Sequence, residues 1–201
     1  NAANPRHYND PRTDGTAQRG NPNGHIIRWL ESTPAALSFR WDVYLFGARS
    51  TASATNVNLS GLTADNDFSS PDGLWFARNG ICWIQTDDGA YTDVTNCMLL
   101  AGIPGTVGDG GPLTITNTDA SGASKSVTTF VGAQPGTAKL RRFLVGPKDC
   151  EITGITESPD GRALFVNIQH PGEDTPAANI GNPSLCTSHW PDGGNARPRS
   201  A

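Results

Sequence analysis

Residues 69–87 read SSPDGLWFARNGICWIQTD, and residues 150–169 repeat this pattern as CEITGITESPDGRALFVNIQ. Gly73 corresponds to Gly154 and Gly80 to Gly161, so both pairs have an offset of about 81 residues. Each copy combines a short apolar strand, an Asn-Gly or Asp-Gly turn and a second apolar strand, which together predict a β-hairpin. Repeated hairpins whose first strands begin at a shared axis are typical of a β-propeller, so the sequence predicts blades around a central channel.

The composition favours short strands and turns over long helices, because the 201 residues include 23 Gly and 15 Pro and only 17% are charged. Alternating apolar residues predict an outer blade hairpin whose strands lie at 25–31 and 39–46. The central blade is predicted to have four strands, at 74–76, 81–85, 96–100 and 139–145, and the next blade begins at 152 and includes 162–169. Loops are predicted for residues 1–23 and from 170 onward, where Pro, Gly and polar residues dominate.

Residues 103–137 interrupt the central blade between its last two strands. Within them, 112–116 and 125–131 have the pattern of two extra strands. An insertion of this kind usually forms an added hairpin at the rim of the fold. It also accounts for a repeat offset that is longer than one ordinary blade.

Charge and motif content exclude several classes of function. The net charge is −4 and no Lys/Arg run is present, so the chain lacks the basic surface that nucleic-acid binding requires. No apolar stretch is long enough to span a bilayer. The sequence contains no Gly-x-Ser-x-Gly elbow, Cys-x-x-Cys pair, His-Glu-x-x-His motif or Walker loop, so serine hydrolysis, structural zinc and P-loop chemistry have no support.

Four cysteines, Cys82, Cys97, Cys150 and Cys186, allow three disulfide pairings. Cys82 and Cys97 lie on strands predicted to be adjacent and antiparallel, so they could form a bridge. Cys150 and Cys186 would then be the second pair. The spacing permits disulfides in an exported protein but does not require them.

A series of motifs runs along the chain in a fixed order: GHIIRW (24–29), FRWD (39–42), SPDGLWF (70–76), WIQTD (83–87), RRFLVGP (141–147), CEITG (150–154), SPDG (158–161), QHPGE (169–173) and WPDG (190–193). NPR at 4–6 precedes them. This series resembles the PhoX family of exported alkaline phosphatases. The resemblance covers nearly all of the chain except 103–137, and ordered motifs are far more specific than a single Gly-rich turn.

The resemblance implies an all-β fold, a partial β-propeller that holds about two blades and neighbouring strands of a six-bladed propeller, with an inserted hairpin in one blade. The chain would correspond to the C-terminal part of a longer exported protein, periplasmic or extracellular. A partial propeller leaves open sheet edges, so we expect the rest of the propeller to cover them, either as missing sequence or as a partner chain.

Asp72 is the strongest candidate metal ligand. Pro71 and Gly73 fix it in a tight turn at the predicted channel mouth, where a carboxylate can bind a hard cation. The alternative is a simple turn in which the Asp72 side chain caps backbone N–H groups. The resemblance favours the metal role, since the corresponding Asp looks like a ligand in the family. Asp160 has similar neighbours, but it aligns with Asn79 and is predicted to form only a hairpin turn.

Glu151 is the second candidate, because it lies between Cys150 and a β-branched strand where a charge needs a compensating cation or donor. The alternative is a buried Glu paired with an arginine such as Arg142. Asp87 follows a strand in a Thr-Asp-Asp-Gly sequence, which can bind calcium but more often forms a turn.

Arg78 is the candidate phosphate contact, since family members often carry a basic residue near this position and Arg binds phosphate in a bidentate manner. A solvent-facing turn residue is the simpler interpretation. His170, in His-Pro-Gly-Glu, is predicted to hold a loop by hydrogen bonds rather than to act as a ligand or acid. Cys150 is predicted to be structural, although a thiolate can bind iron.

The resemblance implies a phosphatase that hydrolyses phosphate monoesters with Ca2+ and Fe3+ bound in the channel. Asp72, Glu151 and Asp87 would supply ligands from one wall, and the remaining ligands would come from sequence outside this chain. Two alternatives stay open: a PhoX-like propeller that serves as a binding or structural module, and a lactonase-type propeller that holds calcium without iron.

Overall fold

The computed structural model describes residues 6–201, so the predicted N-terminal loop is tested only from Arg6 onward. The central element is a four-stranded antiparallel sheet. Its strands are β5 (Pro71–Phe76), β6 (Cys82–Thr86), β7 (Met98–Gly102) and β10 (Leu140–Val145), in the order β10-β7-β6-β5. This is the predicted central blade, with boundaries that differ from the expected ones by up to three residues.

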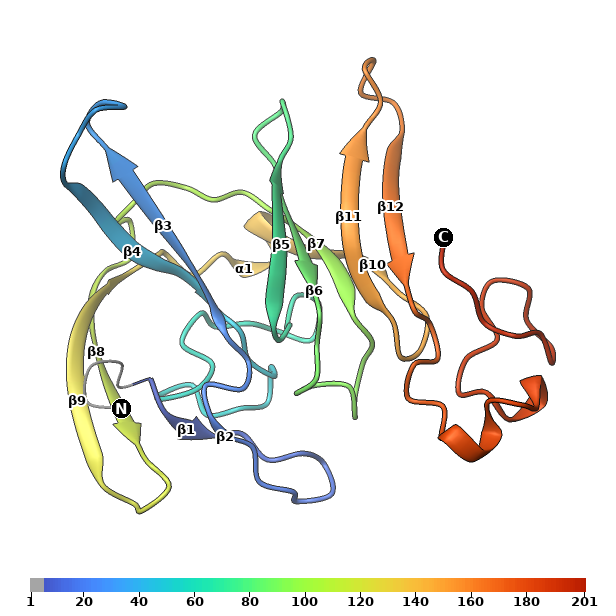
Figure 1. Cartoon of the computed structure of the whole chain (residues 1–201). Helices are drawn as coiled ribbons and strands as arrows, with labels where there is room; N and C mark the ends of the chain where they lie inside the picture. The colour runs from blue at the N-terminus through green and yellow to red at the C-terminus, as the bar shows by residue number, and fades with distance from the viewer. Residues whose placement is uncertain (1–5) are drawn as a thin grey trace.

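Two hairpins lie on either side of this sheet (Figure 1). The first consists of β3 (His25–Glu31) and β4 (Phe39–Phe46), whose bounds match the prediction, and the second of β11 (Glu151–Glu157) and β12 (Leu164–Gln169). In the N-terminal region, which was predicted to be a loop, β1 (Tyr8–Asn9) pairs with β2 (Arg19–Gly20). The stretch after β12 is irregular apart from the short 3-10 turns η1 (Ala177–Asn179) and η2 (Pro183–Leu185).

The two copies of the sequence repeat form the same hairpin. In the first, Gly80 has φ 86° and the Asn79 side chain accepts from the backbone N–H of Ile81 at 3.1 Å. In the second, Gly161 has φ 68° and Asp160 accepts from the N–H of Arg162 at 3.2 Å. Positive φ favours glycine, and Asn or Asp closes such turns locally. Asp160 is therefore a turn residue, as predicted.

The insertion forms a hairpin of β8 (Gly111–Thr118) and β9 (Ser124–Val131), followed by the single turn α1 (Gly136–Lys139). It does not extend its own blade. Instead β9 runs parallel to β4, with Val43 opposite Val131, and completes a sheet in the order β3-β4-β9-β8. The hairpin thus joins the neighbouring sheet, with the consequence that one blade contributes strands to the next.

The buried apolar residues form three clusters that correspond to the sheet interfaces. The first lies between the β3–β4 sheet and the central sheet and contains Leu45, Phe68 and Leu100. The second, which contains Leu99 and Ile152, lies between the central sheet and β11–β12. A small third cluster fills the space between β4 and the insertion. The five residues of β6 are all buried, because this strand has a neighbour on both edges and packing on both faces.

None of the disulfides that the spacing permits is present, because all four cysteines are free. The register of β6 and β7 explains the failure of the Cys82–Cys97 pair: Cys82 lies opposite Gly102, so Cys97 is roughly 16 Å away along the sheet, beyond disulfide reach. Cys97 and Cys150 share the second buried cluster, where Cys150 packs as the predicted structural residue. Cys186 follows η2 and pairs with neither of them.

Among the described residues, no helix is long and apolar enough to cross a membrane.

Candidate functional site

Three of the predicted site residues lie at one end of the β5–β6 and β11–β12 hairpins. Asp72 is the second residue of β5, Asp87 directly follows β6, and Glu151 is the first residue of β11. Pro71 pairs with Thr86, and the Asp87 N–H donates to the Ser70 carbonyl at 3.2 Å, so both aspartates are held at the same end of their hairpin.

A side-chain bridge brings β11 alongside this hairpin. Gln85 Nε2 donates to the carbonyl of Ile152 at 3.3 Å. A Cβ at Gly73 would lie 2.5 Å from Gln85 Oε1, so a larger residue there would force the Gln85 side chain to shift. The register shift between Pro71 and Leu74 falls at the same place. Gly73 thus leaves room for the Gln85 side chain that connects β6 to β11, the strand that begins at Glu151.

The Glu151 carboxylate is only partly compensated. Gln169 Nε2 donates to its Oε2 at 3.1 Å, and His170 Nε2 lies 3.4 Å from the same oxygen. Burial raises the pKa of Glu151, and the nearby charges of Asp87 and Asp72 raise it further, while the His170 contact lowers it. Both aspartates are thus close enough to act on Glu151. No arginine or lysine among the described residues pairs with it, and the alternative Arg142 binds Asp67 instead.

The carboxylates of Asp72 and Asp87 are exposed, and neither side chain makes a hydrogen bond or ion pair with a described residue. The alternative in which Asp72 caps a turn is therefore not what the structure contains. Carboxylates that gather without donors or cations repel one another, and a bound cation relieves that repulsion.

A polar pocket of about 280 Å³ adjoins Asp87. Its charged lining is one arginine, Arg12, and acidic residues from three segments, namely Asp87, Asp88, Asp149, Glu173 and Asp174. Asp149 Oδ2 is buried without a hydrogen-bond partner, and the Asp149 backbone has φ 52°. Asp88 is satisfied structurally, since it accepts from the N–H groups of Ala90 and Tyr91. Carboxylate oxygens are the donors that calcium prefers, so this donor set fits a hard cation.

The described residues do not complete a metal site by themselves: no three of their His, Cys, Asp and Glu side chains converge closely enough to hold an ion. Asp149 is the acidic residue that the sequence analysis missed. It stands two positions before Glu151, and the DCE sequence (149–151) is the signal that could have drawn attention to it.

The structure does not bring Arg78 to this end of the hairpin. Arg78 lies in the turn after β5, about 20 Å from Asp72 at roughly 3.3 Å per residue, and its Nη1 donates to the Pro159 carbonyl at 3.5 Å. His170 has φ 36° and its Nδ1 lies 3.0 Å from Glu173 Oε2. It therefore links the loop after β12 to Glu151, in keeping with the predicted loop-holding role.

The sequence model of alkaline phosphatase PhoX matches residues 2–172. The chain belongs to the PhoX family. A solved structure of PhoX from Pseudomonas fluorescens, in complex with the transition state analogue vanadate, is 31% identical and superposes with a TM-score of 0.60. The match covers 90% of this chain and 26% of the Pseudomonas chain, so this PhoX segment spans about a quarter of that protein. A comparison with curated proteins gave no match. The expected partial β-propeller is confirmed.

Proposed function

We propose that this PhoX segment forms one wall of the metal-binding channel of a phosphatase that hydrolyses phosphate monoesters. The observation that carries the proposal is the gathering of Asp72, Asp87 and Glu151 at one end of two repeated hairpins, where no lysine or arginine of the described residues forms an ion pair with them, although Arg12 lines the pocket beside Asp87. A structural ion pair would have placed a basic side chain there, as Arg142 does for Asp67.

The three carboxylates would hold calcium or iron, the ions that the family resemblance implies. Bound ions of this kind act as Lewis acids that stabilise the charge developing on phosphate oxygens. Gln169 and His170 orient the Glu151 carboxylate through its Oε2, and Gln85 holds β11 beside β6. Arg78 has no part in this proposal, because it lies at the far end of β5.

The remaining ligands would come from the rest of the propeller, as missing sequence or as a partner chain. Support comes from the short match to the Pseudomonas protein and from the incomplete ligand set of the described residues. An exported protein, periplasmic or extracellular, is the corresponding expectation for its location. The substrate would be a small phosphate ester rather than a nucleic acid, in keeping with a net charge of −4.

The test is to purify the longest form of the protein that its source produces and to measure bound metals together with 4-nitrophenyl phosphate hydrolysis. We expect iron and calcium with activity. Asp72→Asn and Glu151→Gln should each remove a ligand charge, lower the metal content and reduce kcat at least about a hundredfold, as losses of transition-state electrostatics do.

Asp160→Asn is the matched control, because Asp160 occupies the tip of the second repeat and only closes a turn. It should leave both metal content and turnover unchanged. Full activity in the Asp72 and Glu151 variants would refute their role as ligands. Calcium without iron and without hydrolysis would favour the calcium-only propeller, and no metal would favour a binding or structural module.

A further inference from the structure

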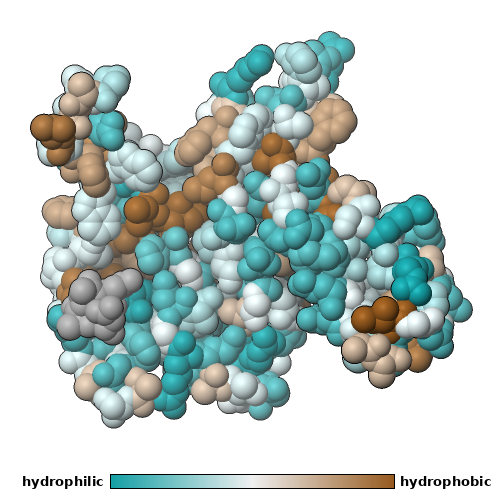
Figure 2. All heavy atoms as spheres, viewed as in Figure 1, coloured by the Kyte–Doolittle hydropathy of each residue, from teal (hydrophilic) through white to brown (hydrophobic). Residues whose placement is uncertain are grey.

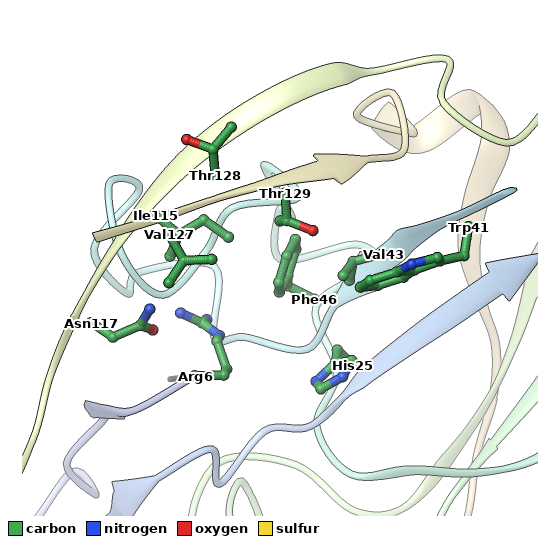
Figure 3. Close-up of a pocket in the computed structure, with 10 residues that line it drawn as sticks. All are labelled: Arg6, His25, Trp41, Val43, Phe46, Ile115, Asn117, Val127, Thr128 and Thr129. Atoms are coloured by element: carbon green, nitrogen blue, oxygen red, sulfur yellow. The ribbon is translucent and has the colours of Figure 1, made fainter. Parts of the chain in front are cut away.

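A cavity of about 310 Å³ lies on the side of β4 that faces away from the central sheet (Figure 3). The insertion, which the proposed function does not use, forms its far wall. The apolar lining comes from both walls: Trp41, Val43, Phe46, Ile115 and Val127. A volume near 300 Å³ is at the small end of ligand-binding pockets.

One cation lines this cavity without a matching anion. Arg6 Nη1 donates to the Asn56 carbonyl at 2.5 Å and Nη2 to the Val57 carbonyl at 3.2 Å, while the buried Nε has no acceptor. No carboxylate among the described residues pairs with this guanidinium, which packs instead 4.2 Å above the Tyr8 ring. Burial without a counter-ion lowers the pKa of Arg6 to about 10.

A second donor lines the same cavity. Asn117 is 5% exposed; its Oδ1 accepts from the His7 N–H at 3.1 Å, and its Nδ2 donates to no described residue. Figure 3 shows the Arg6 guanidinium directed between Asn117 and Phe46. His25 carries no compensating negative charge, and burial together with Arg6 lowers its pKa and favours the neutral ring.

We propose that this cavity binds a small aromatic carboxylate. The carboxylate would accept from the Arg6 guanidinium where it lines the cavity and from Asn117 Nδ2, and the ring would lie among Phe46, Trp41 and the aliphatic residues of β4 and the insertion. Uncompensated buried cations are costly, and a bound anion offsets that cost. A phosphate dianion does not suit a cavity with one cation and a mainly apolar lining, so this ligand differs from the substrate of the proposed phosphatase site.

The test is a fluorine NMR titration of the protein, in the form that its source produces, with 4-(trifluoromethyl)benzoate. The neutral analogue 4-(trifluoromethyl)benzyl alcohol is the matched probe. We expect the acid to bind at least about tenfold more tightly than the alcohol, the difference that a hydrogen-bonded charge gives. Inorganic phosphate should not displace the acid.

Three variants connect the binding to these residues. Arg6→Gln should remove the preference for the acid, and Val127→Trp, which fills the cavity, should abolish binding of both probes. Ser124→Trp places the same side chain on an exposed position of β9 and should bind like the wild type.

Because Arg6 also holds the segment at 56–57, the cavity-filling variant remains decisive if Arg6→Gln fails to fold. Equal affinity for the two probes, displacement by phosphate, or full binding by Val127→Trp would overturn the proposal. Asp72→Asn should bind the acid normally, which separates this site from the proposed channel.

Discussion

The Arg49 guanidinium is buried among groups from two distant segments. Its Nη2 lies 2.7 Å from Asp93 Oδ1 and 3.1 Å from the Ala90 carbonyl, and its Nε lies 3.7 Å from Asp10 Oδ2. Burial alone would raise the pKa of Asp93, but hydrogen bonds from Arg49 and Thr13 outweigh it and lower this pKa from 3.8 to about 2. The same balance between burial and the Arg28 contact lowers the pKa of Asp109 to about 2.

These depressed pKa values predict how stability depends on pH. A carboxyl group with a lower pKa in the folded state stabilises the protein above its unfolded pKa, near 4, and loses that contribution as pH falls through the folded pKa near 2. The thermal midpoint should therefore fall between about pH 4 and pH 2. In Asp93→Asn the midpoint should be lower at neutral pH and the slope in this window smaller. Asp65→Asn, on an exposed turn, is the control and should keep the wild-type slope; an unchanged slope in Asp93→Asn would contradict the prediction.

Sequence reasoning selected Asp72 and Glu151 because each stands near the start of the first strand in its copy of the repeat, and their role as ligands stays a prediction. Arg78 was also selected from its neighbours in the sequence. It lies beyond the opposite end of β5 from Asp72, and the local sequence does not show which end of the strand carries the site. The possible bridge between Cys82 and Cys97 is excluded for a related reason, since adjacency of two strands does not fix their register.

At the scale of elements, Arg28 connects the insertion to the β3–β4 hairpin. Its Nη2 lies 2.7 Å from Asp42 Oδ2 and 2.6 Å from Asp109 Oδ1, and the Gly108 N–H also donates to Asp42 at 2.6 Å. The Asp42 side chain is fully buried. This ion pair therefore joins β3, β4 and the loop that precedes β8.

Removal of this cation should be costly. Arg28→Met leaves the buried Asp42 without its charge partner and should lower the free energy of unfolding by about 3–5 kcal/mol, as measured by urea denaturation. Hydrogen exchange should accelerate in β9. The double variant Arg28→Met/Asp42→Leu should recover part of the loss, because it also removes the uncompensated anion. If the single variant is as stable as the wild type, the ion pair does not anchor the insertion.

The strands of the insertion were predictable, whereas their partner was not. Residues 112–116 and 125–131 alternate as strands do, and both lie within the observed β8 and β9. The pairing of β9 with β4 rests on one parallel register position and on the Gly132 N–H, which donates to the Val43 carbonyl at 2.8 Å. Nothing in the local pattern of either strand encodes a contact between such distant segments.

At the scale of the whole molecule, a large apolar surface stays exposed. Figure 2 shows apolar residues along the groove between two projecting hairpins. Ile27 and Trp29 of β3 and Leu74 and Phe76 of β5 are each more than 40% exposed and line a pocket of about 250 Å³ there. Such a surface is typical of an interface, which fits a segment that matches 26% of a larger propeller.

The 201-residue chain on its own should therefore be inactive. Even with added calcium and ferric iron it should not hydrolyse 4-nitrophenyl phosphate, because the described residues lack a complete ligand set. The longest natural form, assayed in the same buffer, is the positive control. Turnover by the 201-residue chain would show that one wall of the channel is sufficient.

The pairing of β9 with β4 also determines when the chain can complete its first sheet. The contact between Val43 and Val131 closes a loop that contains all of β5, β6, β7 and β8. Lengthening such a loop adds little to the entropy of closure, since each doubling costs only about 0.6 kcal/mol. The constraint is one of order during synthesis: β4 leaves the ribosome long before β9 exists. The edge of β4 that pairs with β9 must therefore wait until the four strands between them have been made.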